Sequence, residues 1–175
     1  MKRYVALLRG INLGTRNRVS MAKLREVCEK VGATNVRTLI ASGNVVLDSD
    51  LIAGALRRRL ELDFEREFGF GVLFVVLSAA EMKDVVEHNP FADAGPKTVH
   101  VAFAAESIDG STKQKLEALD AGDERAVVRG RWIYMYLPRG FEGVNLLGMG
   151  SSKMKPPVTI RGWPTVLKLR DMAAS

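Results

Sequence analysis

The order of strand-like and helix-like segments in the first 77 residues most constrains the fold of this chain. Short apolar β-rich runs alternate with longer segments in which apolar residues recur every three or four positions, the spacing of one helix face. The order is β-α-β-β-α-β, which is typical of the split β-α-β arrangement of ferredoxin-like domains. The predicted strands are residues 3–8, 36–40, 44–48 and 72–77.

Capping and turn residues mark the ends of these elements. The first helix is predicted to begin at Ser20, whose hydroxyl can accept from free backbone amides, and Gly32 can supply its left-handed end. The second helix carries an apolar residue at every fourth position from Ile52 to Phe68. The "ASG" segment at 41–43 has the length and the glycine of a hairpin turn. Candidate caps for the second helix are Asp48, Ser49 and Asp50.

The second half of the chain repeats part of this order. Ser78 and Glu81 form a capping box for a helix that ends near Pro90. A strand, a helix and a hairpin closed near Gly130 follow, and a helix from about Thr165 completes the pattern. The strand, the helix and the two hairpin strands are predicted at residues 98–104, 111–119, 124–129 and 132–137.

These patterns predict an α+β fold with two ferredoxin-like (split β-α-β) subdomains, in which mainly antiparallel sheets pack against helices. The N-terminal subdomain covers residues 1–77, and the C-terminal subdomain covers residues 78–175. The C-terminal subdomain has a related topology, with a long glycine-rich loop at 138–163 before its terminal helix. Loops of that length are usually functional or disordered.

The composition is that of an ordinary globular protein with an excess of positive charge. The 26 Lys and Arg residues exceed the 20 Asp and Glu residues, which gives a net charge of +6 and a pI near 9.7. This excess favours nucleic acid or small anions as partners, although many basic proteins bind neither. Cys28 is the only cysteine, and we expect a reducing, cytoplasmic location. No apolar stretch is long enough to span a membrane, so no membrane partner is expected.

Several segments spread over nearly the whole chain carry a family resemblance. They are "RYVALLRGINLG", "VSMAKLREVCEKVGATNVRTLIASGNVVLDS", "EHNPF", "WIYMYLP" and "TIRGWPTVLKL". Together they resemble the DUF1697 family of mainly bacterial proteins. The resemblance implies a two-subdomain α+β fold and leaves the chemistry open. The chain departs from the family pattern in the shortened segment "SSKMKPPVTIRGWPTV", where Gly162 stands in place of the usual asparagine.

The connection between the first strand and the first helix is longer than the roughly two to six residues typical of such loops. Its sequence, "RGINLGTRNRV", is rich in arginine, asparagine and glycine. In the predicted topology the first and third strands are neighbours, so this loop and the turn at 42–44 lie at the same sheet edge. Free backbone amides, side-chain amides and a helix start all favour anions there. The predicted ligand-binding residues are Arg9, Gly10, Asn12, Arg16, Arg18, Ser42, Gly43 and Asn44.

A structural interpretation of the same residues stays open. Arg9 and Asn12 can hydrogen-bond a curled loop, and Gly43 can serve the hairpin turn. Arg16 and Arg18 can simply be solvated. An open concavity at this edge favours the binding site, whereas a buried Arg9 saturated by backbone carbonyls favours the structural interpretation.

A second candidate site lies near the C-terminus. Trp163 can provide a stacking platform for a base, with Lys153 and Arg161 as neighbouring cations. Alternatively, Trp163 anchors the long loop by packing against the rest of the protein. The alternating aromatic residues of strand 132–137 favour packing over stacking, because no RNA-recognition consensus accompanies them.

Catalytic signatures are scarce. His88 and His100 have no metal-ligand spacing, so no metal centre is predicted. There is no G-x-S-x-G elbow, and Met149 follows Gly148 where a phosphate-binding P-loop needs lysine. No cofactor is predicted, and the question whether the chain is an enzyme stays open.

Three functions are consistent with the sequence. A non-catalytic binding module for nucleic acid or a phosphate-bearing molecule explains the charge, the arginine-rich loop and the lack of catalytic groups. A small-molecule enzyme acting on an anionic substrate at loops 9–18 and 42–44 explains the convergence of these loops, but it needs an acid or base. The third is a structural or partner-binding protein. The oligomeric state is not determined by these patterns.

Overall fold

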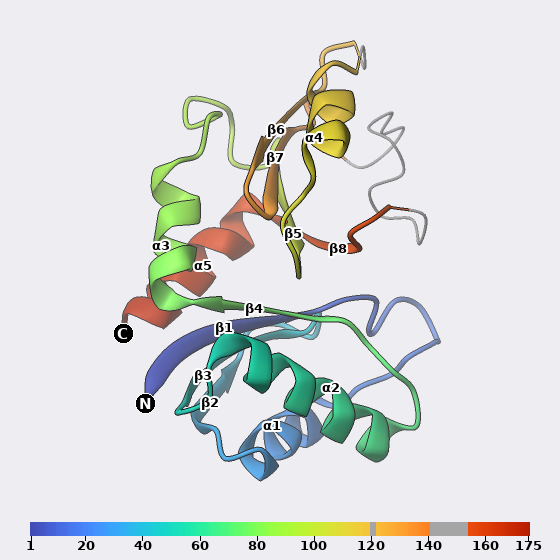
Figure 1. Ribbon diagram of the computed structural model, residues 1–175, viewed down its shortest axis with the longest axis vertical. Coiled ribbons are helices and arrows are strands. Elements are labelled where there is room, and N and C mark those ends of the chain that lie inside the picture. The colour runs from blue at the N-terminus through green and yellow to red at the C-terminus, as the bar shows by residue number, and fades with distance from the viewer. Residues whose placement is uncertain (120–121, 141–153) are drawn as a thin grey trace. The chain divides into compact units, whose positions relative to one another are not determined.

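The computed structural model describes residues 1–119, 122–140 and 154–175, and the chain divides into two compact units (Figure 1). The first unit comprises Met1–Asp84 and Leu169–Ser175, and the second comprises Val85–Lys168. Each unit contains a four-stranded antiparallel sheet together with helices. The predicted α+β class with mainly antiparallel sheets is therefore confirmed.

The elements of the first unit follow the predicted β-α-β-β-α-β order. They are β1 (Lys2–Leu8), α1 (Met21–Lys30), β2 (Thr34–Thr38), β3 (Asn44–Ser49), α2 (Ala53–Phe68) and β4 (Phe74–Ser78). The sheet order is β2-β3-β1-β4, so β1 lies between β3 and β4 and is antiparallel to both. The adjacency of the first and third strands is thus confirmed, and Leu7 pairs with Asn44 at the end of the ladder.

Helices α1 and α2 cover one face of the first sheet (Figure 1). The apolar stripe of α2 is buried at Leu56, Leu60 and Phe64, and α1 contributes Leu24 and Val27. These side chains form one core cluster with alternate residues of the strands. Burial of one aliphatic or aromatic side chain contributes about 2 kcal/mol of transfer free energy. The helical spacing and the strand alternation determine the fold together, because they bring these side chains into one core.

The predicted helix caps are confirmed at two of three helix starts. The Ser20 hydroxyl accepts from the backbone amide of Lys23 at the start of α1. Ser78 and Glu81 form the predicted reciprocal capping box before α3 (Ala79–Glu87). The prediction for α2 is wrong, because its cap position is Ile52, which makes no side-chain cap hydrogen bond. The predicted caps, Asp48, Ser49 and Asp50, all lie before this position. Asp48 forms an ion pair with Arg3 instead.

The second unit repeats the strand order of the first. Its strands and central helix are β5 (Val99–Ala104), α4 (Gly110–Glu117), β6 (Arg125–Arg129), β7 (Trp132–Tyr136) and β8 (Val158–Gly162). The sheet order is β6-β7-β5-β8, which matches β2-β3-β1-β4 position for position. Ala102, Ile133 and Val158 form its core with Leu116 of α4. The terminal helix is α5 (Trp163–Ala174), which begins two residues earlier than predicted.

Strand β8 lies inside the segment predicted to be a loop, residues 138–163. The strand is not predicted because the alternation of apolar and polar residues from Val158 to Arg161 is only four residues long and stands between Pro157 and Gly162. Residues 141–153 of the predicted loop lie outside the described residues. In the ranges that the structure describes, no helix has the length and apolarity needed to cross a membrane.

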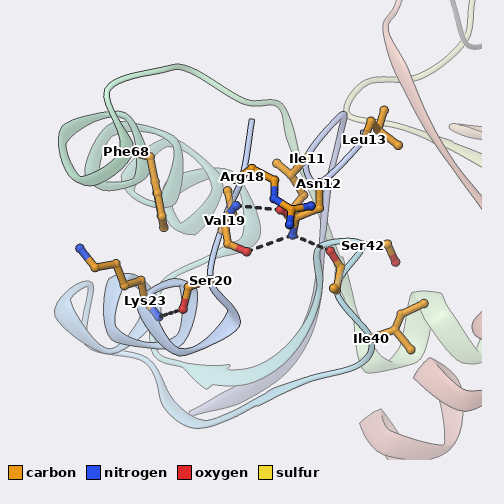
Figure 2. Close-up of a pocket in the computed structure, with 11 residues that line it drawn as sticks. Ile11, Asn12, Leu13, Arg18, Val19, Ser20, Lys23, Ile40, Ser42 and Phe68 are labelled. Carbon is orange, nitrogen blue, oxygen red and sulfur yellow. Dashed lines mark hydrogen bonds between the residues drawn. The ribbon is translucent and has the colours of Figure 1, made fainter. Parts of the chain in front are cut away.

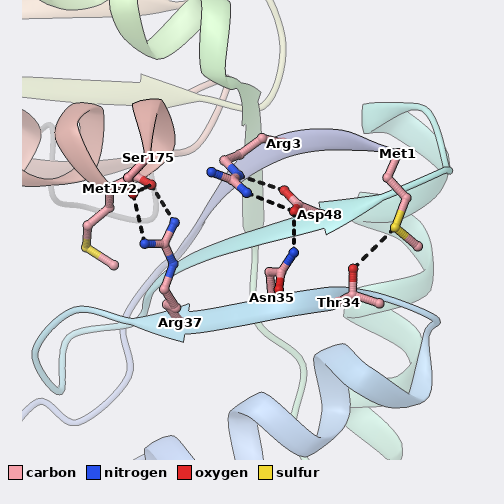
Figure 3. Close-up of polar contacts among 8 residues, drawn as sticks. All are labelled: Met1, Arg3, Thr34, Asn35, Arg37, Asp48, Met172 and Ser175. Atoms are coloured by element: carbon pink, nitrogen blue, oxygen red, sulfur yellow. Dashed lines mark hydrogen bonds and ion pairs between the residues drawn. The ribbon is translucent and has the colours of Figure 1, made fainter.

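A cluster of polar side chains joins strands β1, β3 and β2 of the first sheet (Figure 3). Arg3 on β1 donates to both carboxylate oxygens of Asp48 on β3, at 2.7 and 2.9 Å. Asn35 on β2 donates to the same carboxylate at 2.8 Å. The hydrogen bonds from Arg3 and Asn35 lower the pKa of Asp48 to about 2. Three adjacent strands are thereby joined through one carboxylate.

Replacing Asp48 with asparagine is expected to lower the free energy of unfolding by about 1 kcal/mol at pH 7, because the pair is bidentate but partly solvated. The folded pKa lies below the unfolded value of 3.8, so the contribution of the pair is complete above that pH and is lost as the pH falls towards 2. Urea unfolding of Asp48→Asn and wild type across this range measures the difference. The exposed Asp93→Asn variant is the control, and a difference that persists unchanged at pH 2 would contradict the assignment.

Cys28 provides a probe of the first core. Its thiol is fully buried among the residues of α1 and the sheet, and burial raises its pKa to about 12. We expect no reaction with a thiol reagent at pH 8 on the time scale of minutes, because the reactive thiolate is scarce and covered. Labelling in increasing urea should follow unfolding measured by circular dichroism. Rapid labelling of the native protein would show that this core opens locally.

Candidate functional site

The loop after β1 packs directly against the turn between β2 and β3. The backbone amide of Leu8 donates to the carbonyl oxygen of Gly43 at 2.8 Å. Gly43 has φ of +78°, and a Cβ at this position would lie 2.7 Å from the Cβ of Leu8 and 3.0 Å from the Cδ1 of Ile11. Only glycine fits this conformation and this approach. The prediction that the two segments meet at one sheet edge is confirmed.

Asn12 joins these two segments through its side chain (Figure 2). Its amide nitrogen donates to the carbonyl oxygens of Val19, at 3.0 Å, and Ala41, at 2.7 Å. Its amide oxygen accepts from the backbone amide of Val19 at 2.8 Å. Asn12 also has φ of +53°, a conformation that asparagine tolerates better than most residues. The residue therefore closes the loop on itself and fastens it to the hairpin.

Asn44 organises the hairpin from inside. It is fully buried, and its amide nitrogen donates to the carbonyl oxygen of Leu39 at 3.0 Å and to the hydroxyl of Ser42 at 2.9 Å. Asn44 and Gly43 thus shape the turn rather than offering surface to a ligand. The backbone amide of Arg9 extends the pairing of β1 with β4 by donating to Leu73. The half-buried Arg9 side chain and the exposed Gly10 and Arg16 do not line the pocket described next.

An open pocket of about 830 Å³ lies between the loop, the hairpin turn and the end of α2 (Figure 2). We refer to it as the loop–hairpin pocket. Its floor is apolar, and Ile11 and Val19 on that floor are buried. Three of the predicted ligand-binding residues line it, namely Asn12, Arg18 and Ser42. The full lining is Ile11, Asn12, Leu13, Arg18, Val19, Ser20, Lys23, Ile40, Ala41, Ser42 and Phe68.

The charged residues of the pocket lining are both cations, Arg18 and Lys23. Arg18 is exposed and donates to the carbonyl oxygen of Gly14 at 3.3 Å. The Lys23 ammonium lies 3.2 Å from Glu67, which also pairs with Lys30 at 2.9 Å. Hydrogen bonds from Lys30 and Lys23 lower the pKa of Glu67, so this carboxylate is ionised. One carboxylate is therefore shared by two lysines.

The local sequence accounts for this electropositive character. Every charged side chain before Glu26 is a lysine or an arginine. The arginine-rich loop and the first turns of α1, which form one side of the pocket, fall within that stretch. A concave surface lined by cations concentrates the field and attracts anions.

Two exposed aliphatic side chains also line the pocket. Leu13 on the loop is 71% exposed, and Ile40 on the hairpin is 59% exposed. Ile40 has φ of +50°, which is unfavourable for a β-branched residue. The sequence pattern did not indicate either residue, nor Lys23 or Phe68, because their positions depend on how three segments converge.

The C-terminal candidates belong to the second unit. Arg161 on β8 is buried and donates to the hydroxyl of Thr159 and the carbonyl oxygen of Ile160, both at 2.8 Å. Burial lowers the pKa of Arg161 to about 10, which leaves it charged at neutral pH. Trp163 is half-buried at the start of α5, and Lys153 lies outside the described residues.

The aromatic residues of β7 are packing residues, as predicted. Trp132 and Tyr134 are buried, and the Tyr134 hydroxyl donates to the carbonyl oxygen of Val85 at 2.8 Å. Tyr136 contacts the ring of Phe91 with a centroid distance of 6.0 Å.

Among the described residues, no group of three or more His, Cys, Asp or Glu side chains is arranged to hold a metal ion.

Fold and pocket together define a small α+β protein of two units with a cation-lined pocket at one sheet edge. The chain belongs to the family described as "Protein of unknown function (DUF1697)", whose model matches residues 1–134 and so includes the whole pocket. It is similar to the structure of conserved bacterial protein SP0830 from Streptococcus pneumoniae, with 26% identity, a TM-score of 0.82 and 98% of each chain covered. No match was found among curated proteins.

Replacing Asn12 with alanine is expected to lower the free energy of unfolding by about 2 kcal/mol, because three hydrogen bonds are lost, two of them to the backbone of the buried Val19. Asn17→Ala is the matched control, since Asn17 also has a positive φ and donates one longer bond, 3.2 Å, to Gly10. Urea unfolding measures both variants, and hydrogen exchange at the Val19 amide reports loop opening. Equal effects of the two substitutions would contradict the fastening role of Asn12.

Proposed function

We propose that this protein is a non-catalytic binding module for a small anionic ligand, such as a phosphate-bearing molecule, that binds in the loop–hairpin pocket. The observation that carries the proposal is the lining itself, which combines Arg18 and Lys23 with no carboxylate. Arginine and lysine bind phosphate oxygens through charge-assisted hydrogen bonds. The start of α1 at Ser20 lies in the same lining and adds a favourable dipole.

Binding is favoured over catalysis by the chemistry of the lining. The lining residues include no histidine, cysteine or carboxylate that could act as a general acid or base near neutral pH, and the Glu67 carboxylate beside Lys23 is held by two lysines. An enzyme acting on an anionic substrate remains the alternative, and it requires a group of that kind to reach the pocket. A bound anion that is turned over by the purified protein would favour the alternative.

A small ligand is favoured over nucleic acid by the shape of the surface. Nucleic acid needs a series of phosphate contacts along an extended basic face, and its binding falls steeply with salt. Here the two cations face one concave pocket of about 830 Å³, a volume in the range of small-molecule sites. A flat edge would have favoured a partner-binding protein instead.

Calorimetric titration with inorganic pyrophosphate tests the proposal. Arg18→Ala should weaken binding about tenfold or more, because a charge-assisted hydrogen bond contributes about 1.5–3 kcal/mol. Arg16→Ala removes the same charge from the same loop but outside the pocket lining, so its affinity should stay within about twofold of wild type.

Two outcomes contradict the proposal. One is an absence of pyrophosphate binding by the wild type at millimolar concentration, and the other is an equal loss in Arg16→Ala and Arg18→Ala. A salt dependence as steep as that of an extended polyanion, measured with a single-stranded oligonucleotide, would instead favour nucleic acid.

A further inference from the structure

We infer that the ligand of the loop–hairpin pocket is a phosphomonoester carrying a nonpolar group, with its phosphate at Arg18 and Lys23 and its nonpolar group against Leu13 and Ile40. The inference rests on the proposed function and adds the chemical class of the ligand. It follows from the charge of the pocket, from its exposed aliphatic surface and from the backbone conformation of Ile40.

The pocket offers two cations to one ligand group. Arg18 and Lys23 are the charged residues of its lining, and the Glu67 carboxylate beside Lys23 lies outside the lining and is shared with Lys30. A phosphomonoester carries between about 1.5 and 2 negative charges at pH 7, whereas a carboxylate carries one. The pocket is therefore better matched to a phosphate group than to a carboxylate.

The remaining lining is suited to a nonpolar group. Leu13 and Ile40 are 71% and 59% exposed, and they come from two different segments that both line the pocket (Figure 2). Ile11 and Val19 continue the apolar surface towards the core. A nonpolar group bound there removes aliphatic surface from water, which is favourable.

Ile40 combines an unfavourable backbone conformation with an exposed side chain. In the described part of the chain, the other non-glycine residues with positive φ are Asn12, Asn17 and Asn35. Asparagine tolerates this conformation, whereas a β-branched residue is strained by it. An exposed isoleucine gains little burial to offset that strain, and strained residues cluster at ligand sites.

The test compares phenyl phosphate with inorganic phosphate in calorimetric titrations. Wild type should bind phenyl phosphate about tenfold more tightly than inorganic phosphate, because burial of the ring contributes beyond the shared phosphate contacts. Ile40→Asn and Leu13→Ser should each reduce this ratio to about threefold or less while leaving the affinity for inorganic phosphate within twofold. Leu62→Ser removes an exposed leucine of α2 outside the pocket lining and should leave the ratio unchanged.

A stability measurement separates binding from folding. Ile40→Asn should raise the thermal midpoint by about 2–4 °C, since asparagine relieves the positive-φ strain. A lower midpoint together with weaker binding of both phosphates would show that Ile40 is a structural residue and would overturn the inference.

Two further outcomes distinguish this inference from the proposed function. Equal affinities for phenyl phosphate and inorganic phosphate, with both still weakened by Arg18→Ala, would overturn the ligand class and leave the anion site intact. Benzoate binding as tight as phenyl phosphate would overturn the assignment to a dianion. Binding of inorganic phosphate that is insensitive to Arg18→Ala would overturn the proposed function itself.

Discussion

The side chain of Asn12 is the interaction on which the candidate site depends. Its three hydrogen bonds join two positions of one loop to the neighbouring hairpin, so that a long connection without regular secondary structure keeps a defined shape. The asparagine expected to contact a ligand therefore acts mainly by holding the residues around it. Leu13 and Arg18, which lie in the same loop and line the pocket, are positioned as a consequence.

The topology of the sheet makes this arrangement possible. Because β1 lies beside β3, the chain leaves β1 next to the turn that enters β3, and only Gly43 allows the two backbones to approach so closely. The helix that follows the loop begins at the same edge and contributes Ser20 and Lys23 to the lining. The second unit repeats the strand order of the first.

The fold and the meeting of the loop with the hairpin turn could be predicted from the sequence because they rest on local periodicity and strand order. The apolar spacing of α2 and the glycine of the hairpin turn were sufficient for the first unit. Strand β8 was missed because its alternation of apolar and polar residues, from Val158 to Arg161, is only four residues long and directly follows two prolines. The structural roles of Asn12 and Asn44 could not be distinguished from ligand binding in the sequence. An asparagine whose side-chain amide binds an anion looks the same there as one whose amide binds a backbone carbonyl. The positive φ of Ile40 and the contribution of Phe68 depend on tertiary packing and carry no such signature.

Binding of a small anion at the edge formed by the loop and the hairpin turn can be measured residue by residue. Backbone amide chemical shifts of the isotopically labelled protein, recorded while phenyl phosphate is added, locate the bound anion. We expect saturable shifts at Arg18, Ser20, Lys23 and Ser42, with the amides of β6 and β7 unchanged. Shifts confined to the arginine-bearing hairpin of β6 and β7, with none around Arg18, would contradict it.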